Sequence, residues 1–63
     1  MRLTVHARLE GKGWRSQVVL RDDNPRVPPH LTECRHAHKA EEYALRCGRF
    51  TAAAKYPGME VAS

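Results

Sequence analysis

Two runs of alternating apolar and polar residues, separated by a short glycine-containing segment, constrain the fold of this chain most strongly. Every second residue of each run is apolar or small: Leu3, Val5, Ala7 and Leu9 in the first run, and Trp14, Ser16, Val18 and Leu20 in the second. This period is typical of strands with one buried face. Gly11-Lys12-Gly13 lies between the runs and favours a tight turn. The pattern therefore predicts a β-hairpin whose two apolar faces lie on the same side.

A second pattern, with steps of three and four residues, predicts one amphipathic helix in the C-terminal third of the chain. The expected apolar stripe consists of Ala40, Tyr43, Ala44, Cys47, Phe50, Thr51 and Ala54. Glu41 and Glu42 suit the first turn because the helix dipole favours acids there. Pro57-Gly58 predicts the end of the helix. Gly48 is expected to be its weak point, at a cost of about 1 kcal/mol relative to alanine.

The segment 32–39 between these patterns can be interpreted in two ways. As a strand, it would place Cys34, His36 and His38 on one face. As the first turns of a longer helix starting at Thr32, it would bury almost nothing, so the strand is favoured. The expected fold is therefore α+β, a three-stranded antiparallel sheet in β-β-β-α order with one C-terminal amphipathic helix packed on one face.

The length of the chain limits the size of its core. Residues 1–58 are expected to form a single small domain, and residues 59–63 a disordered tail. A domain of 63 residues buries only about 60% of its unfolded surface. A metal, a disulfide or a homodimer could therefore add stability. Two cysteines are too few for a secreted disulfide scaffold, and no run is long enough for a membrane span. A cytoplasmic location with reduced thiols is expected.

The charge balance favours a polyanionic partner. Eleven Lys and Arg residues against seven acids give a net charge of +4. Such a balance is common in proteins that bind nucleic acid, although it also serves solubility. If the apolar faces of the two strands pack under the helix, Arg8, Arg15, Gln17 and Arg21 must point to the opposite side. The third strand would add Arg35 to this face.

Several short motifs resemble the three-strand-plus-helix DNA-binding domains of the plant AP2 type and the arm-binding domains of phage integrases. The motifs are Gly-Lys-Gly-Trp at 11–14, Arg21-Asp22, Lys39-Ala40-Glu41-Glu42 and Tyr56-Pro57-Gly58. In those domains the exposed face of the sheet lies in the major groove of DNA. The resemblance thus implies that Arg8, Arg15, Gln17, Arg21 and Arg35 contact bases and phosphates. Arginine pairs with two acceptors of guanine or phosphate, and glutamine can do so on adenine.

A cysteine and histidine cluster offers a second chemistry. Cys34, His36, His38 and Cys47 are candidate zinc ligands, because strand and helix could bring them together. Their spacing is not that of a standard zinc finger, since Cys34 and His38 would lie about 13 Å apart on an extended strand. The favoured interpretation is that both cysteines are small buried side chains between sheet and helix, with no cofactor.

These patterns lead to one expectation for function and two alternatives. The leading expectation is a small, basic, non-enzymatic module that binds DNA through the exposed face of its sheet. The first alternative is a protein-binding regulator, for example a phage or mobile-element protein that docks on a host factor. The second is a zinc-stabilised structural domain. No set of nucleophile, base and orienting acid is recognisable, so an enzyme is not expected.

Overall fold

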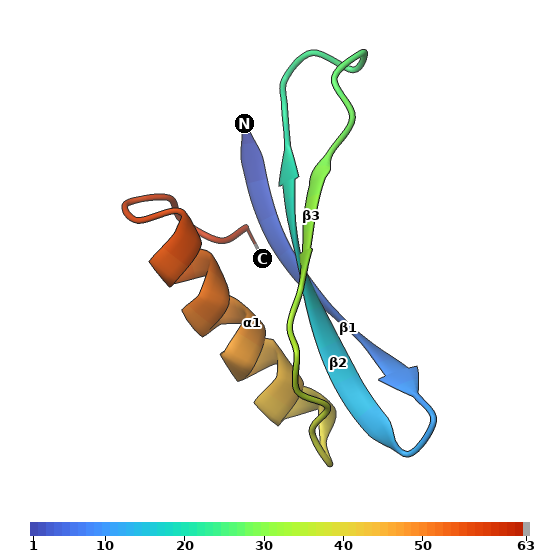
Figure 1. Ribbon diagram of the computed structural model, residues 1–63. Helices are drawn as coiled ribbons and strands as arrows, with labels where there is room; N and C mark the ends of the chain where they lie inside the picture. Colours follow the sequence, from blue (N-terminus) through green and yellow to red (C-terminus); the bar gives the residue numbers. More distant parts are fainter. Residues whose placement is uncertain (63) are drawn as a thin grey trace.

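A computed structural model of the protein describes residues 1–62. In this range the elements are β1 (Arg2–Glu10), β2 (Gly13–Arg21), β3 (His30–Glu33) and α1 (Glu41–Lys55). The strands form an antiparallel sheet in the order β1-β2-β3, and α1 crosses one face of it over β1 and β2 (Figure 1). The predicted α+β class and β-β-β-α order are confirmed. Within the same range, no helix has the length and apolar character needed to cross a membrane.

The hairpin of β1 and β2 places its two apolar faces on the same side, as predicted. Leu3 pairs with Leu20 and Val5 with Val18, so the apolar side chains of both strands share the face under α1. Gly11 opens the two-residue turn with a φ of 61°. A positive φ at the first turn position alone is characteristic of a type II′ turn, which suits glycine and matches the twist of the flanking strands.

The core lies between this hairpin and a helix face made of very small residues. Leu3 and Val18 are each 1% exposed, and they pack with Ala52. Ala44, Gly48 and Ala52 are the buried residues of α1, one turn apart from each other. A Cβ atom at Gly48 would overlap Cγ1 of Val5, so the absent side chain lets the helix backbone approach the sheet.

The predicted helix stripe is therefore only partly correct. Ala44 is buried as expected, but Tyr43 and Phe50 are 51% and 79% exposed. The helix is rotated so that its smallest residues, rather than its largest apolar ones, meet β1 and β2. Close backbone approach over Ala44, Gly48 and Ala52 explains this rotation, because aromatic side chains at the interface would hold the helix away from the sheet. The packing of α1 on the sheet thus requires a residue without a side chain at position 48.

The third strand is shorter than predicted and begins earlier. β3 ends at Glu33, and the helix starts only at Glu41, so a helix from Thr32 is wrong. After the Cys34 amide donates to Ser16 O, the chain bulges, and regular pairing returns only where His38 bonds to Trp14. Three residues, 35–37, thus lie opposite the single residue Arg15. The predicted continuous strand with Cys34, His36 and His38 on one face is wrong for this reason.

The prolines and aspartates of segment 22–29 form a turn and an extended connection, which is exposed except at Pro29. Residues 59–62 belong to the range 59–63, which is expected to form a disordered tail. In the structure the Ala62 amide donates to Leu3 O at 2.8 Å, and the partly buried side chains of Met59 and Val61 pack against the core. Partial burial of these two apolar side chains favours this position of the segment. Ser63, the end of the predicted tail, lies outside the described residues.

Candidate nucleic-acid interface

The sheet face opposite α1 carries most of the residues predicted to contact DNA. Strand alternation and the observed register place two arginine pairs on this face, Arg2 opposite Arg21 and Arg8 opposite Arg15. Between them lie Thr4 opposite Val19 and His6 opposite Gln17, and β3 adds Leu31 and Glu33. The two arginine pairs therefore mark the two ends of one continuous face.

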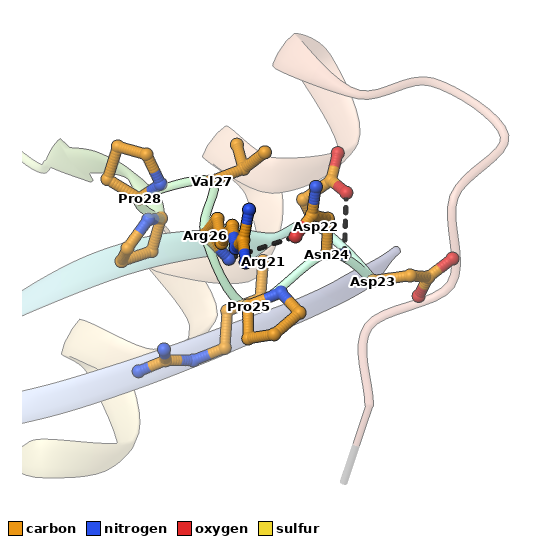
Figure 2. A pocket seen from close by; sticks show the side chains of 9 residues that line it. Arg21, Asp22, Asp23, Asn24, Pro25, Arg26, Val27 and Pro28 are labelled. Atoms are coloured by element: carbon orange, nitrogen blue, oxygen red, sulfur yellow. Dashed lines mark hydrogen bonds between the residues drawn. The ribbon is translucent and has the colours of Figure 1, made fainter.

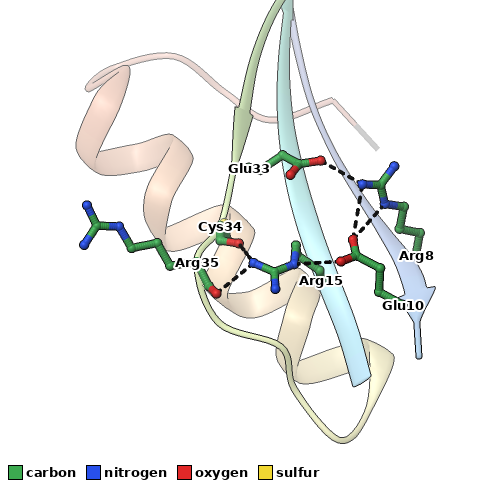
Figure 3. A network of polar contacts seen from close by, with 6 residues as sticks. All are labelled: Arg8, Glu10, Arg15, Glu33, Cys34 and Arg35. Atoms are coloured by element: carbon green, nitrogen blue, oxygen red, sulfur yellow. Dashed lines mark hydrogen bonds and ion pairs between the residues drawn. The ribbon is translucent and has the colours of Figure 1, made fainter. Parts of the chain in front are cut away.

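The Arg8 and Arg15 end is neutralised by acids of the same face. Arg8 Nη2 lies 2.8 Å from Glu33 Oε1, and Arg8 Nε donates to Glu10 Oε2 at 3.2 Å. Arg15 Nε lies 3.3 Å from the other oxygen of Glu10. Figure 3 shows that Glu10 lies between the two guanidinium groups and contacts both, whereas Glu33 contacts Arg8 alone. Two positive charges are thus balanced by two negative ones.

Arg15 has a structural role as well. Its Nη1 donates to Cys34 O at 2.8 Å and to Arg35 O at 2.7 Å, where the chain leaves β3. Its side chain is only 27% exposed, against 62% for Arg8. Carbonyl groups in a bulge lack sheet partners, and a guanidinium can satisfy two of them at once. Arg15 therefore fastens the bulge to the hairpin, which leaves few of its donors for a ligand.

The charges of Arg2 and Arg21, at the other end of the face, are not neutralised in this way. Within residues 1–62 neither guanidinium forms an ion pair. Like charges directly opposite each other on neighbouring strands are destabilising, so this pair costs the fold some stability. A bound anion would relieve that repulsion.

The loop after β2 adds a further cation to this end. Arg21 and Arg26 both line a hollow of about 520 Å³ (Figure 2). Two turns shape the loop: Asp22 Oδ1 accepts from the Asn24 amide, and Asn24 Oδ1 accepts from the Arg26 amide. The other aspartate of the hollow, Asp23, is paired with the N-terminal ammonium of Met1 at 2.7 Å. Asp23 is therefore paired with a cation, whereas Asp22 accepts only a backbone amide and keeps its charge; the side chains of Arg21 and Arg26 form no ion pair among the described residues.

The structure thus places four of the five predicted contact residues on one face. Gln17 and Arg21 are available there, and Arg8 and Arg15 are held by Glu10, Glu33 and the bulge carbonyls. The placement of Arg35 on this face is wrong, because its side chain extends away from the network and only its carbonyl takes part (Figure 3). The bulge at 35–37 breaks the alternation on which that placement rested. Sequence reasoning missed Arg2, although Arg2 and Arg8 are an even number of residues apart and therefore share a face.

The predicted metal ligands come together only in part. Cys34 is 5% exposed, and its Sγ lies 3.5 Å from Thr51 Oγ1, beside Cys47 on α1. His36 is exposed, and the bulge separates His38 from Cys34. Among residues 1–62 no three His, Cys, Asp or Glu side chains gather in a way that could hold a metal ion. Cys34 is thus buried at the sheet–helix junction, and Cys47 is partly buried there.

Burial raises the pKa of the Cys47 thiol, and the neighbouring Cys34 raises it further through its charge and a hydrogen bond. A hydrogen bond to Thr51 acts in the opposite direction but is the smallest of these effects. A raised pKa keeps Cys47 protonated near neutral pH. Cys47 is therefore a thiol of low nucleophilicity under ordinary conditions.

The arrangement offers two chemically distinct sites on opposite sides of the sheet. One is a basic face with an arginine pair that forms no ion pair within residues 1–62, and the other is a pair of free cysteines between the sheet and the helix. Comparison of the chain with protein-family models, curated proteins and solved structures found no match.

Proposed function

We propose that the protein is a non-enzymatic module that binds double-stranded DNA through the sheet face opposite α1. One observation carries this proposal: of two cross-strand arginine pairs on the face, Arg8 and Arg15 are balanced by glutamates, whereas Arg2 and Arg21 are not. Two arginines that repel each other in the free protein both attract an anion, so binding of an anion between them is favourable. The net charge of +4 supports a polyanion as the partner.

The shape of the face suits the major groove. Three strands spaced about 4.8 Å apart span about 10 Å, and the groove is about 12 Å wide. Arg2, Arg21 and Arg26 would contact phosphates at one end, where counterion release favours binding. Gln17 can pair with an adenine edge, and Leu31, which is 53% exposed, can meet a thymine methyl group. This mode agrees with the resemblance to the AP2 and integrase arm-binding domains.

Titration with a DNA duplex at two salt concentrations tests the proposal. The informative variant is Arg2→Ala/Arg21→Ala, and its matched control is Arg46→Ala/Arg49→Ala, which removes the same charge from exposed positions on α1. We expect the first variant to bind more weakly and to lower the salt slope by about two units. The control should change affinity much less, because its arginines do not lie on the sheet face.

Two outcomes would reject this function. Wild-type protein that binds no duplex even at low salt would exclude it directly. Equal weakening by both variants, with the fold intact by circular dichroism, would show that net charge and not the sheet face determines binding.

A protein-binding role is the second candidate, and the exposed aromatic residues of α1 favour it. Phe50 is 79% exposed and Tyr43 51%, on the flank of the helix that faces away from the core. Exposed aromatic side chains are enriched at protein interfaces. Sedimentation of wild type and Phe50→Ser at several concentrations tests the simplest case, a homodimer through this flank. Concentration-dependent association in wild type alone would support it, and monomers in both would reject the homodimer.

A further inference from the structure

Cys34 and Cys47 lie where the chain leaving β3 approaches α1. The helix packs on β1 and β2, whereas β3 forms the edge of the sheet next to β2 and does not lie under the helix. Cys34 directly follows β3, and its Sγ lies 3.5 Å from Thr51 Oγ1, which in turn donates to Cys47 O at 3.0 Å. Thr51 Oγ1 therefore lies between the Cys34 sulfur and the backbone of Cys47, one helical turn before it. Both cysteines are free.

Another polar side chain faces the same junction. Ser16 is 1% exposed, and its Oγ has no hydrogen-bond partner among the described residues. The Cys34 amide donates to the carbonyl of Ser16, which places the hydroxyl and the thiol side by side on the helix-facing side. The junction is therefore a small polar cluster in an otherwise apolar layer, and its two sulfur atoms are the groups that can react with each other.

We propose that Cys34 and Cys47 form an intramolecular oxidation site, which a small-molecule disulfide of the glutathione class converts into a disulfide between β3 and α1. This modification is independent of DNA binding, since it lies on the other side of the sheet from the arginine pairs. Its effect is to add a covalent link where β3 and the helix otherwise meet only through side chains, such as Lys55 Nζ and Thr32 Oγ1 at 3.0 Å.

The exposure of the two thiols sets the order of the reaction. Cys47 is the more accessible one, because Cys34 is 5% exposed. The Cys47 thiol loses its proton to water, and its thiolate attacks one sulfur of the small disulfide. A mixed disulfide forms and one small thiolate leaves, taking up a proton. Cys34, deprotonated in turn, attacks the Cys47 sulfur and releases the second small thiol. The protein loses two protons and two electrons, and the small disulfide takes up both and is reduced to two thiols.

Two measurable consequences follow. Because Cys47 is protonated at neutral pH, the rate of the first step should rise about tenfold for each unit by which the pH increases, as long as the pH stays below the pKa of this thiol. The product closes a loop of about 14 residues, and such a link restricts the unfolded chain. We therefore expect the melting temperature of the oxidised protein to rise by about 10 °C or more, as the size of the domain implies.

The test treats native protein with oxidised glutathione and follows intact mass, free thiols and melting temperature. We expect a monomer that has lost two hydrogen atoms and both free thiols, with a raised melting temperature that a reducing agent restores. Cys34→Ser should stop at a stable mixed disulfide on Cys47. Cys47→Ser should stay largely unmodified while folded, because the remaining thiol is buried.

Three results would overturn the proposal. The first is glutathione adducts on both cysteines without an internal disulfide. The second is disulfide-linked dimers as the main product. The third is oxidation that occurs only when denaturant is present, which would show that the native fold keeps the two thiols from bonding.

Discussion

Replacement of Gly48 by alanine separates two physical effects that act in opposite directions. Gly48 lies in the middle of α1, where alanine is intrinsically better by about 1 kcal/mol. In this structure, however, a Cβ would overlap Val5 Cγ1 and lie 3.0 Å from Cβ and Oγ of Ser16. Val5 and Ser16 belong to paired strands, so neither can retreat without moving the sheet. The clash should outweigh the gain in helix propensity.

The magnitude follows from the two terms. Overpacking of a well-packed interface costs about 1 to 3 kcal/mol, and the gain in propensity offsets about 1 kcal/mol of it. A net loss of up to about 2 kcal/mol is expected. For a domain of this size, a loss of about 2 kcal/mol corresponds to a fall in melting temperature of about 8 to 16 °C. The exposed control Ala53→Gly should cost about 1 kcal/mol through propensity alone.

Urea denaturation of a double-mutant cycle with Val5→Ala provides the assay. Val5→Ala removes Cγ1, the atom that the new methyl group meets first. Gly48→Ala should therefore cost at least about 1 kcal/mol less in this background than in wild type. A stabilising Gly48→Ala in wild type would refute the close approach of helix and sheet, and an additive cycle would refute the role of Val5.

Four further expectations can be checked with the same denaturation assay. Arg15→Gln should destabilise by about 1 to 2 kcal/mol through loss of its bonds to Cys34 O and Arg35 O, whereas Arg2→Gln should stay within about 0.5 kcal/mol. Phe50→Ser should also stay within about 0.5 kcal/mol, because the ring is exposed; a larger loss would contradict the orientation of the helix. Val61→Ser should lower stability by about 1 kcal/mol through lost packing on the core, and Glu60→Ser should not; equal effects would argue against an ordered C-terminal segment. The pKa of the Cys47 thiol is raised in the folded state, so the folded state keeps this proton to higher pH than the unfolded state does. The resulting contribution to stability is present below the ordinary thiol pKa of 9.0 and is lost as the pH rises above it. Cys47→Ala should reduce that loss of stability at alkaline pH.

The parts of the fold that depend on local periodicity could be predicted from the sequence. The alternation in the first two strands set both faces of the hairpin, and Gly11 marked its turn. Acids at the start of the helix and Pro57-Gly58 after it marked its ends. Each of these signals acts over a few residues, where steric and electrostatic rules are strong.

The orientation of the helix depends on a contact that is distant in sequence. Hydrophobic patterning weights Tyr43 and Phe50 heavily, but the sheet selects the side of α1 that allows the closest approach. A small residue contributes little to such a hydrophobic pattern, so the pattern does not predict that it will be buried. The need for a glycine at position 48 can be recognised only when Val5 and Ser16 are known to lie opposite it. The bulge at 35–37 was hidden for a similar reason, since its carbonyls are satisfied by Arg15, twenty residues earlier.

The basic face shows most clearly how tertiary partners change a functional interpretation. In the sequence, Arg8, Arg15 and Arg21 are equivalent members of an alternating pattern. In the structure, Glu33 lies 2.8 Å from Arg8 although 25 residues separate them, and Arg15 is shared between Glu10 and two carbonyls. A ligand phosphate must compete with these partners at one end of the face but not at the other. If the protein binds DNA as proposed, the contacts should concentrate at Arg2, Arg21 and Arg26, and removal of Glu33 should extend them towards Arg8.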